Sequence, residues 1–251
     1  MNLTLYHGEP NGPSLTVLAA LFEKDLTANL VPIDLAAAAR HQFEFAQQPE
    51  VAMSVEGEGP VLVADGVAMA DSVFIACFLD DIGQKNSLRP HDAYARWEMM
   101  AWCRHIIERT APAAAFLGCR AYPPKAAPQQ LAKIVSADLR ARWEQILAGK
   151  FADEQLVDSE AKVTQAVRKC ESQLDGQEWL MGAFSIADLE SYTWLAGMVA
   201  VVPAAFGSAP RTHAWLERVK RRAAVAKALA LASTGNPVRC WAPGPEINRW
   251  G

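Results

Sequence analysis

The residues best suited to chemistry lie in residues 56–72, which read EGEGPVLVADGVAMADS. Pro60 precedes a strand-like segment. An X-Pro bond is the only peptide bond for which cis costs little, and a cis bend at Pro60 would turn the N–H and C=O of Gly59 outward, where they can pair with an extended peptide. Asp71 and Ser72 open a helix-like segment, whose first N–H groups are unsatisfied and attract a carboxylate, while the Asp71 carboxylate attracts an amino group. The two features predict a receptor for a short peptide with a free α-amino-acid end.

The elements around these residues alternate in type. Short β-type segments lie at 3–6, 29–34, 60–64 and 66–70, with a tight Ala-Asp-Gly turn between the last two. A helical pattern, SLTVLAALFEK, opens at Ser14, and a second, DSVFIACFLDDIG, closes at Gly83 as its C′ residue. This order predicts a thioredoxin-like α/β domain over residues 1–83. The proline before the third strand of that plan is usually cis, so we expect a cis bond at Pro60.

The strand signals end near residue 83. Alanine- and leucine-rich stretches follow, punctuated by prolines, and they include Trp97, Trp102, Trp143, Trp194 and Trp215. We expect a linker at 84–90 and an all-helical C-terminal domain over 91–251. Near its end, residues 185–188 (Ser-Ile-Ala-Asp) form a predicted capping box, in which Asp188 reaches back to the amide of Ser185.

Composition excludes several classes of protein. The chain has 251 residues, of which 51% are hydrophobic, and a formal charge of -4 with both signs interspersed, so nucleic acid is a poor partner. No apolar run approaches the roughly 20 residues of a membrane span, and the N-terminus has no signal-peptide pattern, so we expect a cytoplasmic protein. Five widely spaced cysteines predict reduced thiols. No side-chain cluster has metal-ligand spacing, and we expect no metal.

The N-terminal pattern and the stretch WLMGAFSIADLESY at 179–192 together resemble the glutathione S-transferase family. Within it, SLTVLAALFEKDL at 14–26 and NSLRPHDAYARWEMMAW at 86–102 are similar to the bacterial β-etherases, which cleave lignin-derived β-aryl ethers with glutathione. The chain departs from the family at Gly59, where a hydrophobic residue is usual, and at Asp71, where Glu is commoner. Because glycine holds a peptide less firmly, we expect weakened glutathione binding.

The resemblance implies that glutathione is the co-substrate and that its thiolate displaces a phenolate from an aromatic substrate. A hydroxyl donor and a helix N-terminus would stabilise the thiolate. Ser14 is the first candidate, with an ordinary N-cap serine as the alternative; Tyr6 is the rival donor, and Asn11 could support either. His7 is given no catalytic role.

Further binding groups are predicted on both domains. Arg40 and His41 could reach the glycyl carboxylate of glutathione, together with the Gly59-Pro60 and Asp71-Ser72 contacts. A minority of the aromatic and methionine residues Trp97, Met99, Met100, Trp102, Phe116 and Tyr122 could line the substrate pocket, although helical spacing more often indicates core. The resemblance also implies a homodimer or a heterodimer with a paralogous subunit. The alternatives are a general glutathione transferase or lyase, or a non-catalytic subunit.

Overall fold

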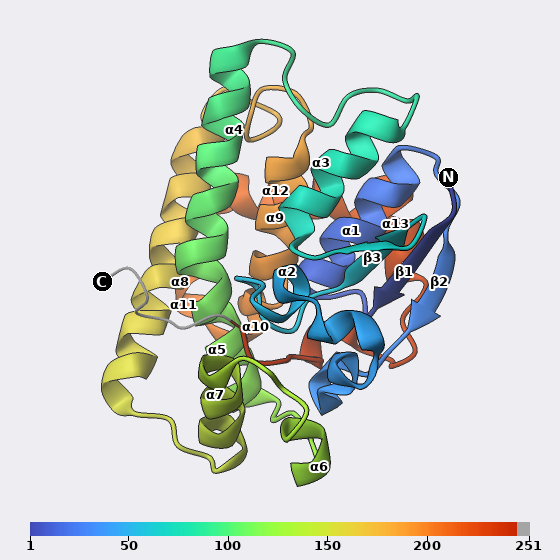
Figure 1. Ribbon diagram of the computed structural model, residues 1–251. Helices are drawn as coiled ribbons and strands as arrows, with labels where there is room; N and C mark the ends of the chain where they lie inside the picture. The colour runs from blue at the N-terminus through green and yellow to red at the C-terminus, as the bar shows by residue number, and fades with distance from the viewer. Residues whose placement is uncertain (245–251) are drawn as a thin grey trace.

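The computed structural model describes residues 1–244; residues 245–251, the end of the predicted helical domain, lie outside the described residues. Its N-terminal part is built on a four-stranded sheet with the order β2-β1-β3-β4 (Figure 1). Strand β1 pairs in parallel with β2 and antiparallel with β3, which forms a hairpin with β4. The strands are β1 (Leu3–His7), β2 (Asn29–Pro32), β3 (Val61–Ala64) and β4 (Val67–Met69). The predicted strand-helix-strand-hairpin-helix order is confirmed.

The two faces of this sheet are covered differently. Helices α1 (Gly12–Glu23) and α3 (Ser72–Ile82) contact each other, and their buried residues join those of β1 and β3 in the main core. On the other face a smaller cluster includes Phe45, Val51 and Val61. It is supplied in part by a segment of short helices, namely η1 (Leu35–Ala37), η2 (Ala39–Gln42), η3 (Glu44–Gln47) and α2 (Pro49–Ala52). Because strand side chains alternate between faces, neighbouring residues of β1 enter different clusters.

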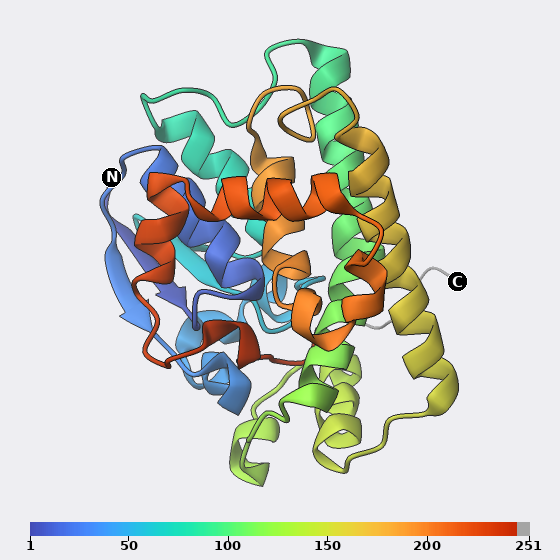
Figure 2. The same cartoon turned by 180° about the vertical axis from the view of Figure 1, so that it is seen from behind.

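The rest of the described chain is helical, as predicted. Two long antiparallel columns, one formed by α4 and α5 and the other by α8, lie side by side. Helix α9 packs against α4 and α5, while α12 and α13 lie behind in the view of Figure 1 (Figures 1 and 2). The elements are α4 (Ala93–His105), a π-helical turn (Ile106–Thr110), α5 (Ala111–Ala121), α6 (Pro128–Leu131), α7 (Ala137–Leu147), α8 (Asp153–Gln173), α9 (Ile186–Leu195), α10 (Met198–Val201), α11 (Pro203–Phe206), α12 (Pro210–Lys220), α13 (Ala223–Leu229) and η5 (Pro237–Arg239). None of the helices in the described part is long and apolar enough to cross a membrane.

Buried polar contacts fasten α1 to the segment that follows α3. Lys24 is 3% exposed, and its Nζ donates to Asp80 Oδ1 at 2.9 Å and to the Lys85 carbonyl at 2.7 Å. Gly83 lies against it: a Cβ at Gly83 would come 2.7 Å from Lys24 Cβ. Helix α3 ends at Gly83 as predicted, and this residue caps the helix with an extended backbone, φ -85. Glycine is needed there for this close approach.

The predicted capping box opens α9. Asp188 is fully buried, and its Oδ2 accepts from the Ser185 amide at 3.0 Å. Asp188 Oδ1 also accepts from the Leu180 amide at 3.0 Å and from Trp215 Nε1 on α12 at 2.9 Å. The carboxylate therefore joins α9, the loop before it and α12, which is more than a local cap does.

Candidate active site

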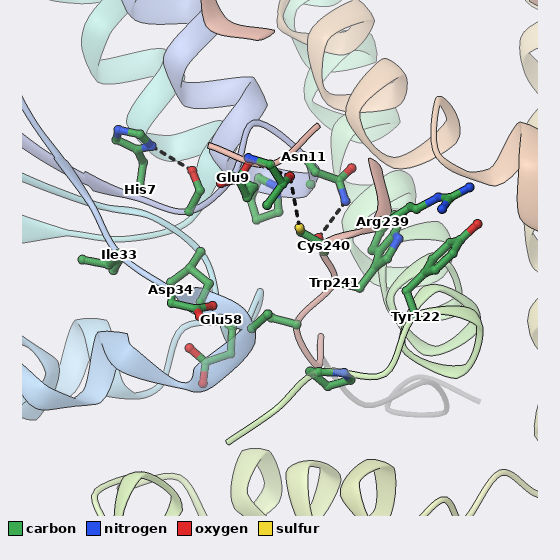
Figure 3. A pocket seen from close by; sticks show the side chains of 18 of the residues that line it. His7, Glu9, Asn11, Ile33, Asp34, Glu58, Tyr122, Arg239, Cys240 and Trp241 are labelled. Carbon is green, nitrogen blue, oxygen red and sulfur yellow. Dashed lines mark hydrogen bonds between the residues drawn. The ribbon is translucent and has the colours of Figure 1, made fainter. Parts of the chain in front are cut away.

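A pocket of about 760 Å³ lies where the start of α1 meets the C-terminal segment 231–244. Figure 3 shows His7, Glu9 and Asn11 on one side of it, Asp34 and Glu58 on another, and Tyr122, Arg239, Cys240 and Trp241 on the opposite side. The pocket thus lies between segments of the N-terminal and helical parts of the chain. Its lining combines polar groups at the beginning of α1 with aromatic rings from the helical part.

The C-terminal segment is held over this pocket by specific contacts. Asn11 Nδ2 donates to the Cys240 carbonyl at 2.9 Å, and the Glu9 carboxylate accepts from the Ser233 amide at 3.2 Å. Trp241 is buried and lies directly on Gly118 of α5, where a Cβ would come 2.3 Å from its ring. Because Gly118 has no side chain, the Trp241 ring can pack against it, and this packing fixes the C-terminal segment as one wall of the pocket.

Ser14 and Asn11 lie together at the start of α1. The helix begins at Gly12 with Asn11 as its N-cap residue, so the alternative of Ser14 as an ordinary N-cap serine is wrong. Ser14 is 1% exposed, and its Oγ accepts from the Gly8 amide at 3.0 Å, while Gly8 and Asn11 line the pocket. Ser14 itself is not one of the lining residues; its hydroxyl lies behind the wall that Gly8 forms, at the positive end of a helix dipole.

Tyr6 lies on the face of the sheet opposite to α1 and α3. Its ring packs against Phe43 and Phe45, with centroid distances of 5.0 and 4.7 Å. Residues Leu3, Leu5 and His7 of β1 face the main core side, so Tyr6 necessarily faces away from them. Tyr6 is absent from the pocket lining, and the structure does not bring it together with Ser14 and Asn11. Its role as a rival thiol donor is corrected to packing.

The loop before Pro60 differs from its predicted form. The described residues contain no cis peptide bond, so the Gly59–Pro60 bond is trans and the expected cis bend is wrong. Trans is the ordinary, slightly favoured state of an X-Pro bond. Arg40, 1% exposed, donates to the carbonyls of Val51 and Gly57, and to that of Gly59 at 3.4 Å. Burial lowers the Arg40 pKa, although nearby carboxylates oppose this shift.

Arg40 and His41 therefore do not face the pocket as predicted, because both bind this loop. His41 Nε2 lies 2.6 Å from Glu58 Oε1, which also accepts from Trp143 Nε1 at 2.9 Å. The other Glu58 oxygen is buried without a hydrogen-bond partner in the described part of the chain, and Glu58 lines the pocket. Where Arg40 and His41 were predicted to face the pocket, the pocket is instead lined by the carboxylate of Glu58.

Asp71 and Ser72 do begin α3, as predicted. Asp71 has a positive φ of 68, and Ser72 is fully buried. The Ser72 hydroxyl lies 2.8 Å from Glu190 Oε2 of α9, whose Oε1 accepts from Trp194 Nε1 at 2.7 Å. Burial raises the pKa of Glu190, against its hydrogen bonds from Trp194 and Ser72. Trp194 lines the pocket, so the start of α3 lies one layer behind it.

Of the aromatic residues proposed for a substrate pocket, Tyr122 lines this one. Met99 and Phe116 are core residues, and Trp102 is buried with its indole N–H donating to Ser191 Oγ at 2.8 Å. Sequence reasoning missed Trp194 and Trp241, which supply most of the aromatic wall. Trp194 lies two residues beyond the 179–192 signature, a signal that could have drawn attention to it.

Two other predicted features can be placed. The five cysteines are free thiols; Cys240 lines the pocket, and burial raises its pKa. Within residues 1–244, no group of three or more His, Cys, Asp or Glu residues could hold a metal ion.

The sheet order, the helical second part and the pocket between them define a glutathione S-transferase fold. Residues 1–81 match the family described as the glutathione S-transferase N-terminal domain. The N-terminal part of the chain therefore belongs to this family, and the described chain as a whole has the glutathione S-transferase fold.

Among individual relatives, the chain is similar to the protein LigF of Sphingobium sp. (strain NBRC 103272 / SYK-6). The two are 27% identical over 244 residues, which cover 90% of this chain and 92% of LigF. The crystal structure of the β-etherase LigF superposes with a TM-score of 0.80 at 25% identity, covering 92% of this chain and 99% of LigF. Glutathione transferase F7 from Populus trichocarpa shares the fold, with a TM-score of 0.65 at 22% identity over 90% of this chain and 99% of its own. The comparisons support glutathione transferase-family activity.

Proposed function

We propose that the chain is a glutathione-dependent β-etherase. The sulfur of glutathione forms a C–S bond to the carbon next to an aryl ketone, the C–O bond to the phenolate breaks, and the thiol proton ends on the released phenol. The adjacent ketone lowers the barrier to displacement at that carbon. Ser14 and the N-terminus of α1 stabilise the thiolate, and Asn11 supports this end of the pocket.

The observation that carries the proposal is the two-sided lining of the 760 Å³ pocket. One wall is the start of α1, where Gly8, Asn11 and Gly12 lie in front of the Ser14 hydroxyl. The facing wall carries the rings of Tyr122 and Trp241, and Trp194 lines the pocket beside Gly12. Such a pocket suits a thiolate on one side and an aryl group on the other, and the similarity to LigF supports the same chemistry.

The test is release of a fluorescent phenol from a ketone that carries it as a β-aryl ether. The purified chain is mixed with glutathione and each enantiomer of the ether, and the thioether product is identified by mass spectrometry. Glutathione-dependent release above the rate without protein supports the proposal. Conjugation of a general electrophile, such as an aryl halide, without phenol release would instead support a general transferase.

We further propose that the chain pairs with a second subunit through the face formed by α3 and α4. Phe74, Tyr94 and Trp97 are each more than 60% exposed there, at 64, 66 and 61%. Phe74 and Trp97 border an apolar hollow of about 410 Å³. Exposed apolar patches of this kind are typical of interaction sites. Light scattering of the purified chain and of a Trp97→Glu variant distinguishes a homodimer, whose mass the substitution halves, from a chain that is monomeric by itself and needs a paralogous partner.

A further inference from the structure

Glu56 occupies the N-terminus of α3. Its Oε2 accepts from the Ser72 amide at 2.9 Å, and its Oε1 accepts from the Ser72 hydroxyl. The residue is 2% exposed. A helix N-terminus attracts a carboxylate because its first N–H groups are unsatisfied and carry positive partial charge. Here that carboxylate belongs to the chain itself.

The same residue also satisfies Asp71. Asp71 Oδ1 accepts from the Glu56 amide at 3.2 Å and from the Ser54 hydroxyl at 2.6 Å. Glu56 thus gives one carboxylate to Ser72 and one N–H to Asp71. These are the two contacts that the α-carboxylate and the amino group of an amino acid would make at this position.

Gly59 leaves the room for this arrangement. A Cβ at Gly59 would lie 3.0 Å from Glu56 Oε2 and 3.6 Å from Glu56 Cβ, so a larger residue would press on the side chain. Arg40 fixes the same 54–59 loop by donating to the carbonyls of Gly57 and Gly59. The glycine that departs from the family pattern and the acid three residues before it therefore form one structural unit.

The contact between Glu56 and Ser72 has a free-energy cost. Glu190 Oε2 lies 2.8 Å from the same Ser72 hydroxyl, whose single proton serves two carboxyl groups. Burial and the neighbouring Glu190 raise the pKa of Glu56 well above its ordinary value. Keeping Glu56 ionised beside Glu190 in this buried site costs free energy, and this cost weakens the contact between Glu56 and Ser72.

We propose that Glu56 is an intramolecular competitor for the amino-acid end of glutathione, and that glutathione reaches Asp71 and Ser72 only after the 54–59 loop releases them. This inference rests on the proposed use of glutathione. Glu56 also lines the 760 Å³ pocket, so its release joins the start of α3 to the pocket where the thiol reacts. In the parent chain, glutathione and its fragment cysteinylglycine, which lacks the γ-glutamyl group, then bind with similar affinity.

The experiment is calorimetric titration of the parent, Glu56→Ala and Gly59→Ala with glutathione and with cysteinylglycine. Gly59→Ala presses on Glu56 without removing its charge, and φ at Gly59 is not in the left-handed region, so alanine is tolerated by the backbone. If the loop is open about a tenth of the time, both variants bind glutathione about tenfold more tightly, and cysteinylglycine binding stays unchanged. Glu50→Ala, which removes an exposed acid nearby, is the control and leaves both affinities at the parent value.

Two results overturn the inference, and they are distinguishable. If the parent already binds glutathione much more tightly than cysteinylglycine, and neither variant increases that preference, Glu56 does not compete, while the proposed function stands. If neither the parent nor the variants bind glutathione at millimolar concentration, the inference and the proposed function both fail. Thermal melts of each variant establish that it is folded before titration, and Gly59→Ala carries the test if Glu56→Ala does not fold.

Discussion

Replacing Asp188 with alanine should destabilise the chain by far more than loss of a helix cap. The cap alone would be worth about 1 kcal/mol. In the structure, however, the carboxylate accepts four hydrogen bonds, from the amides of Leu180 and Ser185, the Ser185 hydroxyl and the Trp215 indole. The hydroxyl can turn to another acceptor, but the three N–H donors stay buried without a partner.

The magnitude follows from two opposing terms. Three unpaired buried donors cost about 1–3 kcal/mol each, or about 6 in total. Burial raises the pKa of Asp188 from 3.8 to about 6, so removing the ionised group recovers about 3 kcal/mol near neutral pH. We therefore expect a net loss of about 3 kcal/mol in the free energy of unfolding.

Equilibrium urea denaturation at pH 7.5, followed by tryptophan fluorescence and circular dichroism, measures this loss. Asp153→Ala is the matched control, because Asp153 is an exposed acid in the first turn of α8 and should change stability by about 0.5 kcal/mol. A loss for Asp188→Ala of less than about 1 kcal/mol, or one equal to that of the control, would refute the reasoning that the carboxylate joins α9 to α12.

Three further outcomes are expected. Ser14→Ala should lower turnover by ~10²-fold while changing glutathione affinity less than about threefold, and Tyr6→Phe should leave both near the parent value; equal losses in the two variants would contradict the assignment. Gly118→Ala should displace Trp241, since a Cβ there would come 2.3 Å from the ring, and make limited proteolysis of the C-terminal segment faster; an unchanged cleavage rate would count against the fixed wall. Because the pKa of Asp188 is raised, its contribution to stability is full below about pH 4 and is lost as pH rises through about 6. The free energy of unfolding of the parent relative to Asp188→Asn should therefore fall by about 3 kcal/mol between pH 4 and 7.5. A difference that stays constant over this range would refute the raised pKa.

Patterns along the chain were enough to predict the elements and several of their ends. Alternation and helical spacing are local properties, and they gave the four strands, α1, α3 and the helical second part. The beginning of α3 at Ser72 and the cap of α9 at Ser185 were predicted for the same reason, because the polar residues that start a helix lie within a few positions of the groups they satisfy. The face of Tyr6 could also have been inferred once Leu3 and Leu5 were assigned to the core.

Tertiary structure decided what occupies the site. Glu56 contacts Ser72 across 16 residues, Ser72 contacts Glu190 across 118, and Asn11 contacts Cys240 across 229. Contacts at such separations depend on how whole elements pack, which no local period specifies. The sequence by itself therefore determined a thioredoxin-like sheet with a helix start suited to a carboxylate. Only the tertiary structure determined that the carboxylate at this helix start is that of Glu56. Gly59 leaves space for the Glu56 side chain, and Arg40 holds the loop that carries it.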